Sequence, residues 1–250
     1  MKVKVNRIKG NNLASLVKKM ITMDSQIYLT LSDNQVSSSV FLATKDVVKK
    51  TYLGLADVFE LDEPLDKPLK LAFFNGSKVI SALQYFDLAA IHGEISCLEI
   101  DGEYYAEYLT IEDNSLKMKL NCTDPDLGFV SMTPAQIDIA FSNKAKKYEF
   151  DMVESDLTKI MNLNGTEKSE LFSVYGDNNG IHIAGDNYDY IIDDSNTTPL
   201  EKVHVHKKFL DKLDKENYSV QVCTGEQNKL VLTSRSTETS IALNLALGVE

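Results

Sequence analysis

The amino-acid sequence predicts an α+β fold in which short helices gather on one face of antiparallel sheets. Runs of alternating apolar and polar residues, typical of half-buried strands, recur along most of the 250 residues. Turn-forming residues separate these runs. Four short stretches instead space their apolar residues as amphipathic helices do, and each is followed by strand-like runs. The sequence therefore predicts a helix–hairpin unit that recurs four times.

The clearest of these units lies at residues 204–233. Its first part, 204–216, is predicted to be a short helix whose apolar side is formed by Val205, Phe209, Leu210 and Leu213. Residues 219–223 and 229–233 then alternate polar and apolar around a loop that contains Gly225, which is the pattern of a half-buried hairpin.

Three more helices are predicted at residues 11–23, 75–86 and 154–163. In the first, apolar residues fall at positions i, i+3, i+4 and i+7, namely Leu13, Leu16, Val17 and Met20. The third begins with Glu154 and Asp156, whose negative charges suit the N-terminal end of a helix dipole.

The remaining regular segments have the pattern of strands. The dipeptide Asp101-Gly102 is a strong signal for a two-residue hairpin turn. Ile137–Phe141 is predicted to be a strand because its apolar residues alternate, and Thr239–Val249 alternates in the same way. Residues 47–59 fit either a strand or a helix.

Residues 121–134, NCTDPDLGFVSMTP, form the one clear boundary, because they contain two prolines and a glycine and have no periodicity. The chain is therefore predicted to have two similar domains, 1–122 and 135–250, joined by a connector at 123–134. Four apolar residues stand in this connector: Leu127, Phe129, Val130 and Met132. They either pack onto the sheet beneath or form the wall of a groove that a partner peptide enters.

Composition argues against several classes of protein. A formal net charge of −11 is unlike that of a simple basic nucleic-acid binder, whose affinity comes mainly from neutralising phosphates. No apolar run reaches about 18 residues, so no membrane-spanning helix is predicted. The three cysteines lie far apart without a CxxC motif, which fits a reducing compartment.

No motif of a known enzyme class is present: the sequence lacks a P-loop and the GxGxxG, GxSxG and HExxH patterns. His204 and His206 would share one face of a strand, but a metal site needs a third ligand that the sequence does not place. The acidic stretch with Asp186, Asp189 and Asp193 lacks the glycine and the final glutamate of an EF-hand loop. We therefore expect no metal, no cofactor and no catalysis.

Charge is distributed unevenly between the predicted elements. The four helices hold eight lysines and five acidic residues, whereas the whole chain has a net charge of −11. The eight lysines are Lys18, Lys19, Lys78, Lys159, Lys207, Lys208, Lys212 and Lys215. Lysines are common on solvated helix faces, but this separation favours helices that together face an anionic partner, while the strands and loops are acidic.

This pattern resembles the DNA sliding clamps, and within them the processivity factors of T-even-type bacteriophages. The likeness covers nearly the whole chain and lies in the order of its elements, since clamps have no catalytic signature. The stretches that carry it are FNGSKVISALQYF (74–86), DLTKIMNLNGTEKSELFSVYGDNNGIHIAG (156–185), HKKFLDKLDKENYSVQVCTGEQNKLVLTS (206–234) and STETSIALNLAL (236–247).

The resemblance implies a ring of three two-domain subunits whose helices line a hole for duplex DNA, which is bound without sequence preference. It implies a protein of the cytoplasm of an infected bacterial cell that tethers a DNA polymerase and is opened by a clamp loader. Clamps of this type can also contact transcription machinery, a role that the sequence leaves open. The eight helix lysines would contact DNA, and a partner peptide would enter a groove flanked by Leu127, Phe129, Val130, Met132 and Leu247.

Edge strands offer unpaired backbone groups to another chain. The resemblance implies that the last strand of the first domain, Leu116–Leu120, pairs with Tyr188–Ile192 of a neighbouring subunit. Such a head-to-tail contact closes into a ring.

Two other classes of protein stay open at this point. A structural β-protein, such as a capsid or tail accessory module, accounts for the strands and turns equally well, but not for four recurring helices with lysines. A small-molecule enzyme is a weaker alternative, because the sequence offers no nucleophile, acid–base pair or cofactor loop.

Overall fold

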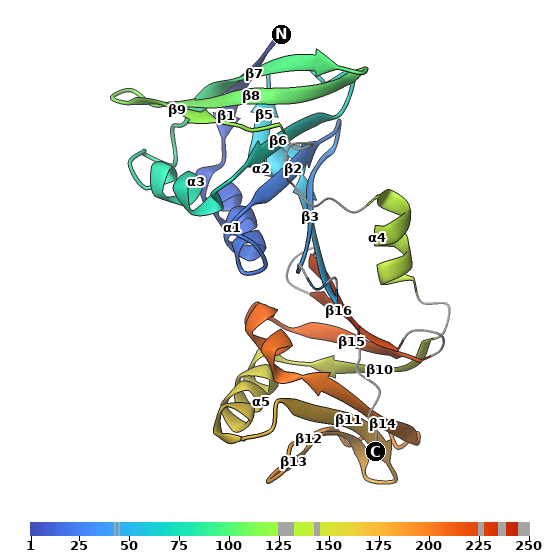
Figure 1. Ribbon diagram of the computed structural model, residues 1–250. Coiled ribbons are helices and arrows are strands. Elements are labelled where there is room, and N and C mark those ends of the chain that lie inside the picture. Colours follow the sequence, from blue (N-terminus) through green and yellow to red (C-terminus); the bar gives the residue numbers. More distant parts are fainter. Residues whose placement is uncertain are drawn as a thin grey trace. The chain divides into compact units, whose positions relative to one another are not determined.

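The computed structural model describes residues 1–42, 44, 46–124, 133–142, 146–224, 228–234 and 239–244. The chain folds into two compact units. Unit 1 comprises Met1–Leu42 and Lys49–Thr133, and unit 2 comprises Ala43–Val48 and Pro134–Glu250. Each unit combines β-sheet with short helices, so the predicted α+β class is confirmed (Figure 1).

The strands of unit 1 are β1 (Lys2–Ile8), β2 (Ile27–Leu31), β3 (Gln35–Phe41), β4 (Val47–Gly54), β5 (Phe59–Leu61), β6 (Leu69–Phe73), β7 (His92–Ile100), β8 (Glu103–Glu112) and β9 (Lys117–Asn121). They follow the order β4-β3-β2-β6-β8-β7-β1-β5, and β9 lies beside β8. Most neighbours are antiparallel, whereas β6 and β8 are parallel. The region that the sequence left ambiguous contains β4, one helical turn and the start of β5.

The helices of unit 1 are α1 (Gly10–Ile21), α2 (Leu55–Val58) and α3 (Gly76–Leu83). The predicted helices at 11–23 and 75–86 are confirmed as α1 and α3, which pack against each other. Where they meet, a Cβ on Gly76 would lie 2.6 Å from Cγ2 of Ile21, so only glycine lets the two helices approach this closely. The apolar stripe of α1 is buried as predicted, with Leu13, Leu16, Val17 and Met20 each at most 1% exposed.

The turn between β7 and β8 is the predicted two-residue hairpin. Ile100 pairs with Glu103, and Asp101 and Gly102 between them have φ angles of 51° and 83°. Both angles are positive, as a type I′ turn requires, which explains why Asp-Gly stands here.

Unit 2 holds β10 (Lys146–Met152), β11 (Leu171–Asp177), β12 (Gly180–Ala184), β13 (Asp189–Asp193), β14 (Leu200–His206), β15 (Tyr218–Cys223), β16 (Lys229–Ser234) and β17 (Thr239–Asn244). They form two sets, ordered β10-β15-β16-β17 and β13-β12-β11-β14. The helical segments are α4 (Pro134–Phe141), α5 (Glu154–Thr166) and the 3₁₀ helix η1 (Lys207–Lys212). Both sets of strands, α5 and η1 share one core, which includes Phe150, Ile160, Phe172, Ile183, Leu210, Val220 and Leu232.

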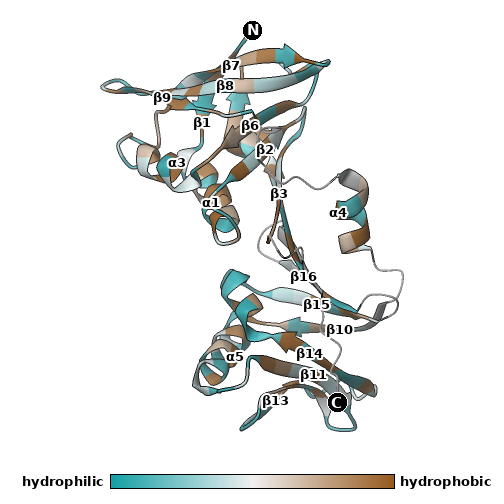
Figure 2. Cartoon of the chain, viewed as in Figure 1, coloured by the Kyte–Doolittle hydropathy of each residue, from teal (hydrophilic) through white to brown (hydrophobic). Residues whose placement is uncertain are grey.

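The helix α5 confirms the helix predicted at 154–163 and extends it to Thr166. Apolar and polar residues are mixed along α1 and α5, as expected for helices that bury one side (Figure 2). The hairpin predicted at 219–223 and 229–233 is confirmed as β15 and β16.

The helix predicted at 204–216 is wrong over most of its length. Residues 204–206 belong to β14, where His206 pairs with Leu171 and Val205 faces the core. Helical structure begins only at Lys207 and consists of six residues of 3₁₀ helix. Residues 204–206 form a strand because their backbone groups are hydrogen-bonded to β11, so they do not need the local hydrogen bonds of a helix.

The strand predicted at Ile137–Phe141 is also wrong, because these residues belong to α4. Proline at the first helical position suits a helix start, since its missing N–H is one that the first turn leaves unpaired. At the other end, the buried Lys229 ammonium donates hydrogen bonds to the carbonyls of Ile139 and Ala140, at 2.8 and 2.9 Å. A cation at the last carbonyls of a helix is favourable, and here it ties α4 to β16.

Truncating the buried stripe of α1 should destabilise the protein strongly. Leu16→Ala removes a side chain that is 1% exposed and should lower the free energy of unfolding by about 2–5 kcal/mol. Urea denaturation followed by circular dichroism measures this change. Ser15→Ala, on the exposed side of the same helix, should change the free energy by less than about 0.5 kcal/mol.

Candidate functional site

The first candidate surface is the polar side of the helices in unit 1. Lys18 on α1 and Lys78 on α3 are exposed, and their ammonium groups make no ion pair within the described residues. Lys19 is half-buried. Tyr85, just after α3, is 71% exposed and adds an aromatic ring that the sequence pattern did not single out. The helices of unit 1 therefore present two available lysines beside mainly uncharged polar residues.

In unit 2, the exposed Lys159 on α5 is held near β13. Its ammonium lies 5.3 Å from the centroid of the Tyr190 ring and 3.4 Å from the hydroxyl of that tyrosine. The same hydroxyl donates a hydrogen bond of 2.7 Å to Asp156. Lys159 thus keeps its charge at the surface while Tyr190 restricts its position.

Two of the predicted lysines support the structure of their own unit. The Lys207 ammonium donates to the carbonyl of Glu167, at 3.1 Å, just past the C-terminal end of α5. The Lys208 ammonium lies 3.1 Å from Asp46 Oδ2. Burial alone would raise the pKa of Asp46, but hydrogen bonds from Thr44 and Lys208 hold it below its usual value. Both lysines are therefore only partly available to a partner.

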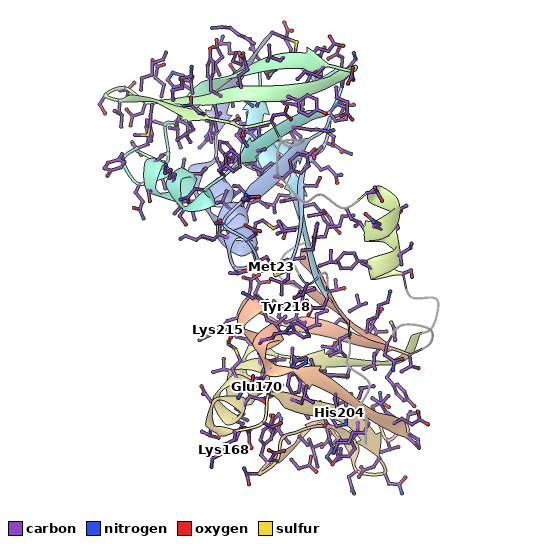
Figure 3. All side chains as sticks on the ribbon, viewed as in Figure 1. Met23, Lys168, Glu170, His204, Lys215 and Tyr218 are labelled. Carbon is purple, nitrogen blue, oxygen red and sulfur yellow. The ribbon has the colours of Figure 1, made fainter. Side chains whose placement is uncertain are left out.

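The other cations of this region are Lys212, which is half-buried, and the exposed Lys215 and Lys168 (Figure 3). Lys168 is absent from the predicted set, because the predicted helix ends at residue 163. It follows α5 directly, so the true end of that helix brings it to the same end as Lys207. The lysines best placed for an anionic partner are thus Lys18, Lys78, Lys159, Lys168 and Lys215.

The predicted partner groove cannot be located in this structure. Leu127, Phe129, Val130, Met132 and Leu247 all lie outside the described residues. The described helix next to the connector is α4, whose Ile139 is 61% exposed. An exposed isoleucine on a short apolar helix is compatible with a partner surface but does not identify one.

A second kind of candidate surface lies at two sheet edges. β9 pairs with β8, and β13 pairs with β12, and each has one neighbour among the described strands. Alternate residues of a strand point to opposite faces, so each edge carries two rows. On the face away from the core the rows are Lys117, Lys119 and Asn121 on β9, and Asp189 and Ile191 on β13, where a register shift before Asp193 ends the alternation. On the core side they are Met118 and Leu120, and Tyr190 and Ile192.

Within the described ranges, no group of three or more His, Cys, Asp or Glu side chains could hold a metal ion. His204 instead has its Nδ1 3.0 Å from the hydroxyl of Ser173, and His206 meets the ring of Phe209 edge-on. No described helix is long and apolar enough to span a membrane.

Comparison with solved structures identifies the fold. Proliferating cellular nuclear antigen from Entamoeba histolytica matches with a TM-score of 0.68 and 11% identity, over 98% of both chains. The A. fulgidus PCNA structure that contains the C-terminal region of FEN-1 gives 0.66 and 11%, over 99% of both chains. The chain has the sliding-clamp fold.

A bacterial clamp extends this likeness. The Helicobacter pylori beta clamp bound to a DNA ligase peptide matches with a TM-score of 0.63 and 14% identity, over all of this chain and 68% of the clamp. No protein-family model and no curated protein sequence matches the chain. The chain therefore shares its fold with these clamps, although its sequence is too different from known families to give a match.

The capping role of Lys207 can be tested by stability. Lys207→Met should lower the free energy of unfolding by about 1 kcal/mol, because the Glu167 carbonyl loses its charged donor. Lys215→Met, which removes the same charge from an exposed position, should change it by less than about 0.5 kcal/mol. Equal melting temperatures of the two variants by circular dichroism would contradict the cap.

Proposed function

We propose that this chain is a DNA sliding clamp of the T-even bacteriophage type, which encircles duplex DNA and tethers a replicative DNA polymerase without catalysing a reaction. The observation that carries the proposal is the clamp fold over the whole chain, together with exposed lysines on the helices of both units. A strand-rich capsid or tail module would not require lysines at these positions.

A clamp needs only a weak and sequence-independent attraction to DNA, because the closed ring holds the duplex topologically. A few exposed lysines supply this attraction through phosphate contacts, which carry no sequence information. The net charge of −11 is then compatible with function, since acidic residues elsewhere disfavour binding of DNA outside the ring. Lys18, Lys78, Lys159, Lys168 and Lys215 are the proposed main contacts, with lesser roles for Lys19, Lys207, Lys208 and Lys212.

The proposed ring is a head-to-tail trimer in which β9 of one subunit pairs with β13 of the next. The composition of the two edges supports this pairing. If the sheets continue across the contact, Lys117 and Lys119 share a face with Asp189 of the neighbour, and the apolar rows share the other face. Opposite charges and apolar pairs across neighbouring strands are both stabilising.

The proposed partners are a DNA polymerase and a clamp loader, each docking through a short peptide, and host or phage transcription machinery as a further partner. Two of the structures with the same fold contain such segments, the FEN-1 C-terminal region and a DNA ligase peptide. By resemblance, the peptide would bind at Leu127, Phe129, Val130, Met132 and Leu247. The protein would act in the cytoplasm of the infected cell.

Neutralising available lysines on α1 and α3 and just after η1 tests the proposed DNA contact. A variant with Lys18→Gln, Lys78→Gln and Lys215→Gln should reduce loader-dependent primer extension about fivefold at low salt, because phosphate contacts are lost. The difference from the parent should shrink as salt rises, since screening weakens the same contacts in both proteins. Circular dichroism should show nearly unchanged stability, because exposed charges contribute little to folding.

The matched control replaces three lysines on the sheet faces away from the helices, Lys2, Lys4 and Lys202, by glutamine. This control should retain the activity of the parent. If both triple variants are as active as the parent at low salt, the helix lysines do not contact DNA and the clamp proposal loses its main support.

Reversing the charge of the β9 edge tests the ring. Lys117→Glu with Lys119→Glu should convert the trimer, of three 27.9 kDa subunits, largely to monomer, because both glutamates would lie on the same face as Asp189 of β13 and would repel it. Light scattering coupled to size exclusion measures the mass. Lys2→Glu with Lys4→Glu makes the same charge change on β1, which β7 and β8 separate from β9, and should leave the trimer intact. A trimer in both variants would place the contact elsewhere.

A further inference from the structure

A charged cluster around the buried His182 links three strands next to the β13 edge, and its carboxylates Asp177 and Asp189 are half-exposed. His182 lies on β12, and its side chain is 6% exposed. Its Nδ1 is 2.8 Å from Asp189 Oδ1 on β13, and its Nε2 is 3.0 Å from Asp177 Oδ1 on β11. The ring stacks on Tyr175, with centroids 4.6 Å apart and an angle of 13° between the planes.

This geometry requires a charged imidazole. A neutral ring has one N–H donor and one nitrogen lone pair, whereas both nitrogens here face carboxylate oxygens. Both contacts are hydrogen bonds only if both nitrogens carry a proton. The imidazolium is then attracted to Asp177 and Asp189 at once, so its charge joins β11, β12 and β13.

The groups around the ring fix the direction of its titration. Burial opposes the charged form, but the hydrogen bonds and charges of Asp189 and Asp177 outweigh it, so the pKa of His182 is raised above its usual 6.5. The Tyr175 hydroxyl donates to Asp189, and the Lys202 ammonium on β14 lies 5.9 Å from the centroid of the Tyr175 ring. The pKa of Asp177 is lowered, chiefly by the backbone N–H of Asn179, so this carboxylate stays ionised when His182 titrates.

Deprotonation would weaken the attachment of β13. The neutral ring would turn a lone pair toward one carboxylate and would no longer attract either by charge. β13 has β12 as its neighbour in the described sheet, so a weaker contact between His182 and Asp189 reduces what holds this strand in position. Asp189 also lies on the face of β13 that carries the proposed contact with Lys117 and Lys119 of β9.

We propose that protonated His182 locks β13 in the position that accepts the neighbouring subunit, so that the ring loosens as His182 loses its proton. The inference rests on the proposed ring. Because the folded-state pKa lies above the unfolded one, the stabilisation is complete below about pH 6.5 and is lost as the pH rises through the folded-state value.

The experiment compares subunit dissociation at pH 6.0 and pH 8.5, at constant ionic strength, by sedimentation velocity. In the parent, the concentration at which half of the trimer has dissociated should rise about fivefold or more at the higher pH. His182→Gln should remove this dependence and resemble the parent at pH 8.5. Asp177→Asn should move the transition to lower pH, because it removes one of the two carboxylates that favour the charged ring.

Two histidine controls exclude other titrations. His204→Gln changes a histidine on β14 of the same sheet, and His92→Gln changes one that pairs with Glu112 near β9. Both variants should keep the pH dependence of the parent. If His182→Gln keeps it as well, or if the parent trimer is equally stable at both pH values, the proposed lock is wrong.

Hydrogen exchange separates failure of the lock from failure of the ring. If the parent is monomeric at every pH, the proposed ring is wrong, but the lock still predicts a local effect. Protection factors of the β13 amides, corrected for intrinsic exchange, should fall between pH 6.0 and 8.5 in the parent and not in His182→Gln. Equal protection of β13 in the two proteins at both pH values would overturn the lock independently of assembly.

Discussion

Burial of one apolar side of each short helix is the interaction on which the arrangement of both units depends. In unit 1, the buried apolar stripe of α1 and the close approach of α3 at Gly76 determine which side of these helices faces solvent. Core packing therefore fixes the solvent side of these helices, on which Lys18 and Lys78 lie. The opposite sheet face and the sheet edges are left to carry other contacts.

Features that depend on neighbouring residues could be predicted from the sequence. The Asp101-Gly102 turn follows from the positive φ angles that a two-residue hairpin needs, and α1 follows from the spacing of Leu13, Leu16, Val17 and Met20. The two errors arose where one pattern fits two structures. In α4, Ile137, Ile139 and Phe141 alternate as they would in a strand, but the contact that supports a helix comes from Lys229, about 90 residues later.

The candidate site was less predictable because the role of a lysine depends on what lies within reach of its ammonium. Lys207 and Lys215 look alike in the sequence, yet only Lys207 has a carbonyl at the end of α5 beside it. Lys168 was missed since α5 continues three residues beyond the predicted end. The link between His182, Asp177 and Asp189 depends on the register of three strands, which the sequence does not specify residue by residue.

The interactions of Lys207 and Lys208 within their own chain affect how strongly DNA binding by the proposed ring would depend on salt concentration. Lys207 lies 3.5 Å from the carboxylate of Glu170, and Lys208 lies 3.1 Å from that of Asp46. A lysine already paired with a carboxylate of its own chain releases few counterions from DNA, so it adds little to the slope of log affinity against log salt, which is about −0.9 for each phosphate neutralised. The affinity of the proposed ring for DNA would therefore depend only weakly on salt. Each lysine would also exchange one phosphate for the next at little cost in free energy, so the duplex could slide through the ring. Retention on DNA would then depend on how often the ring opens.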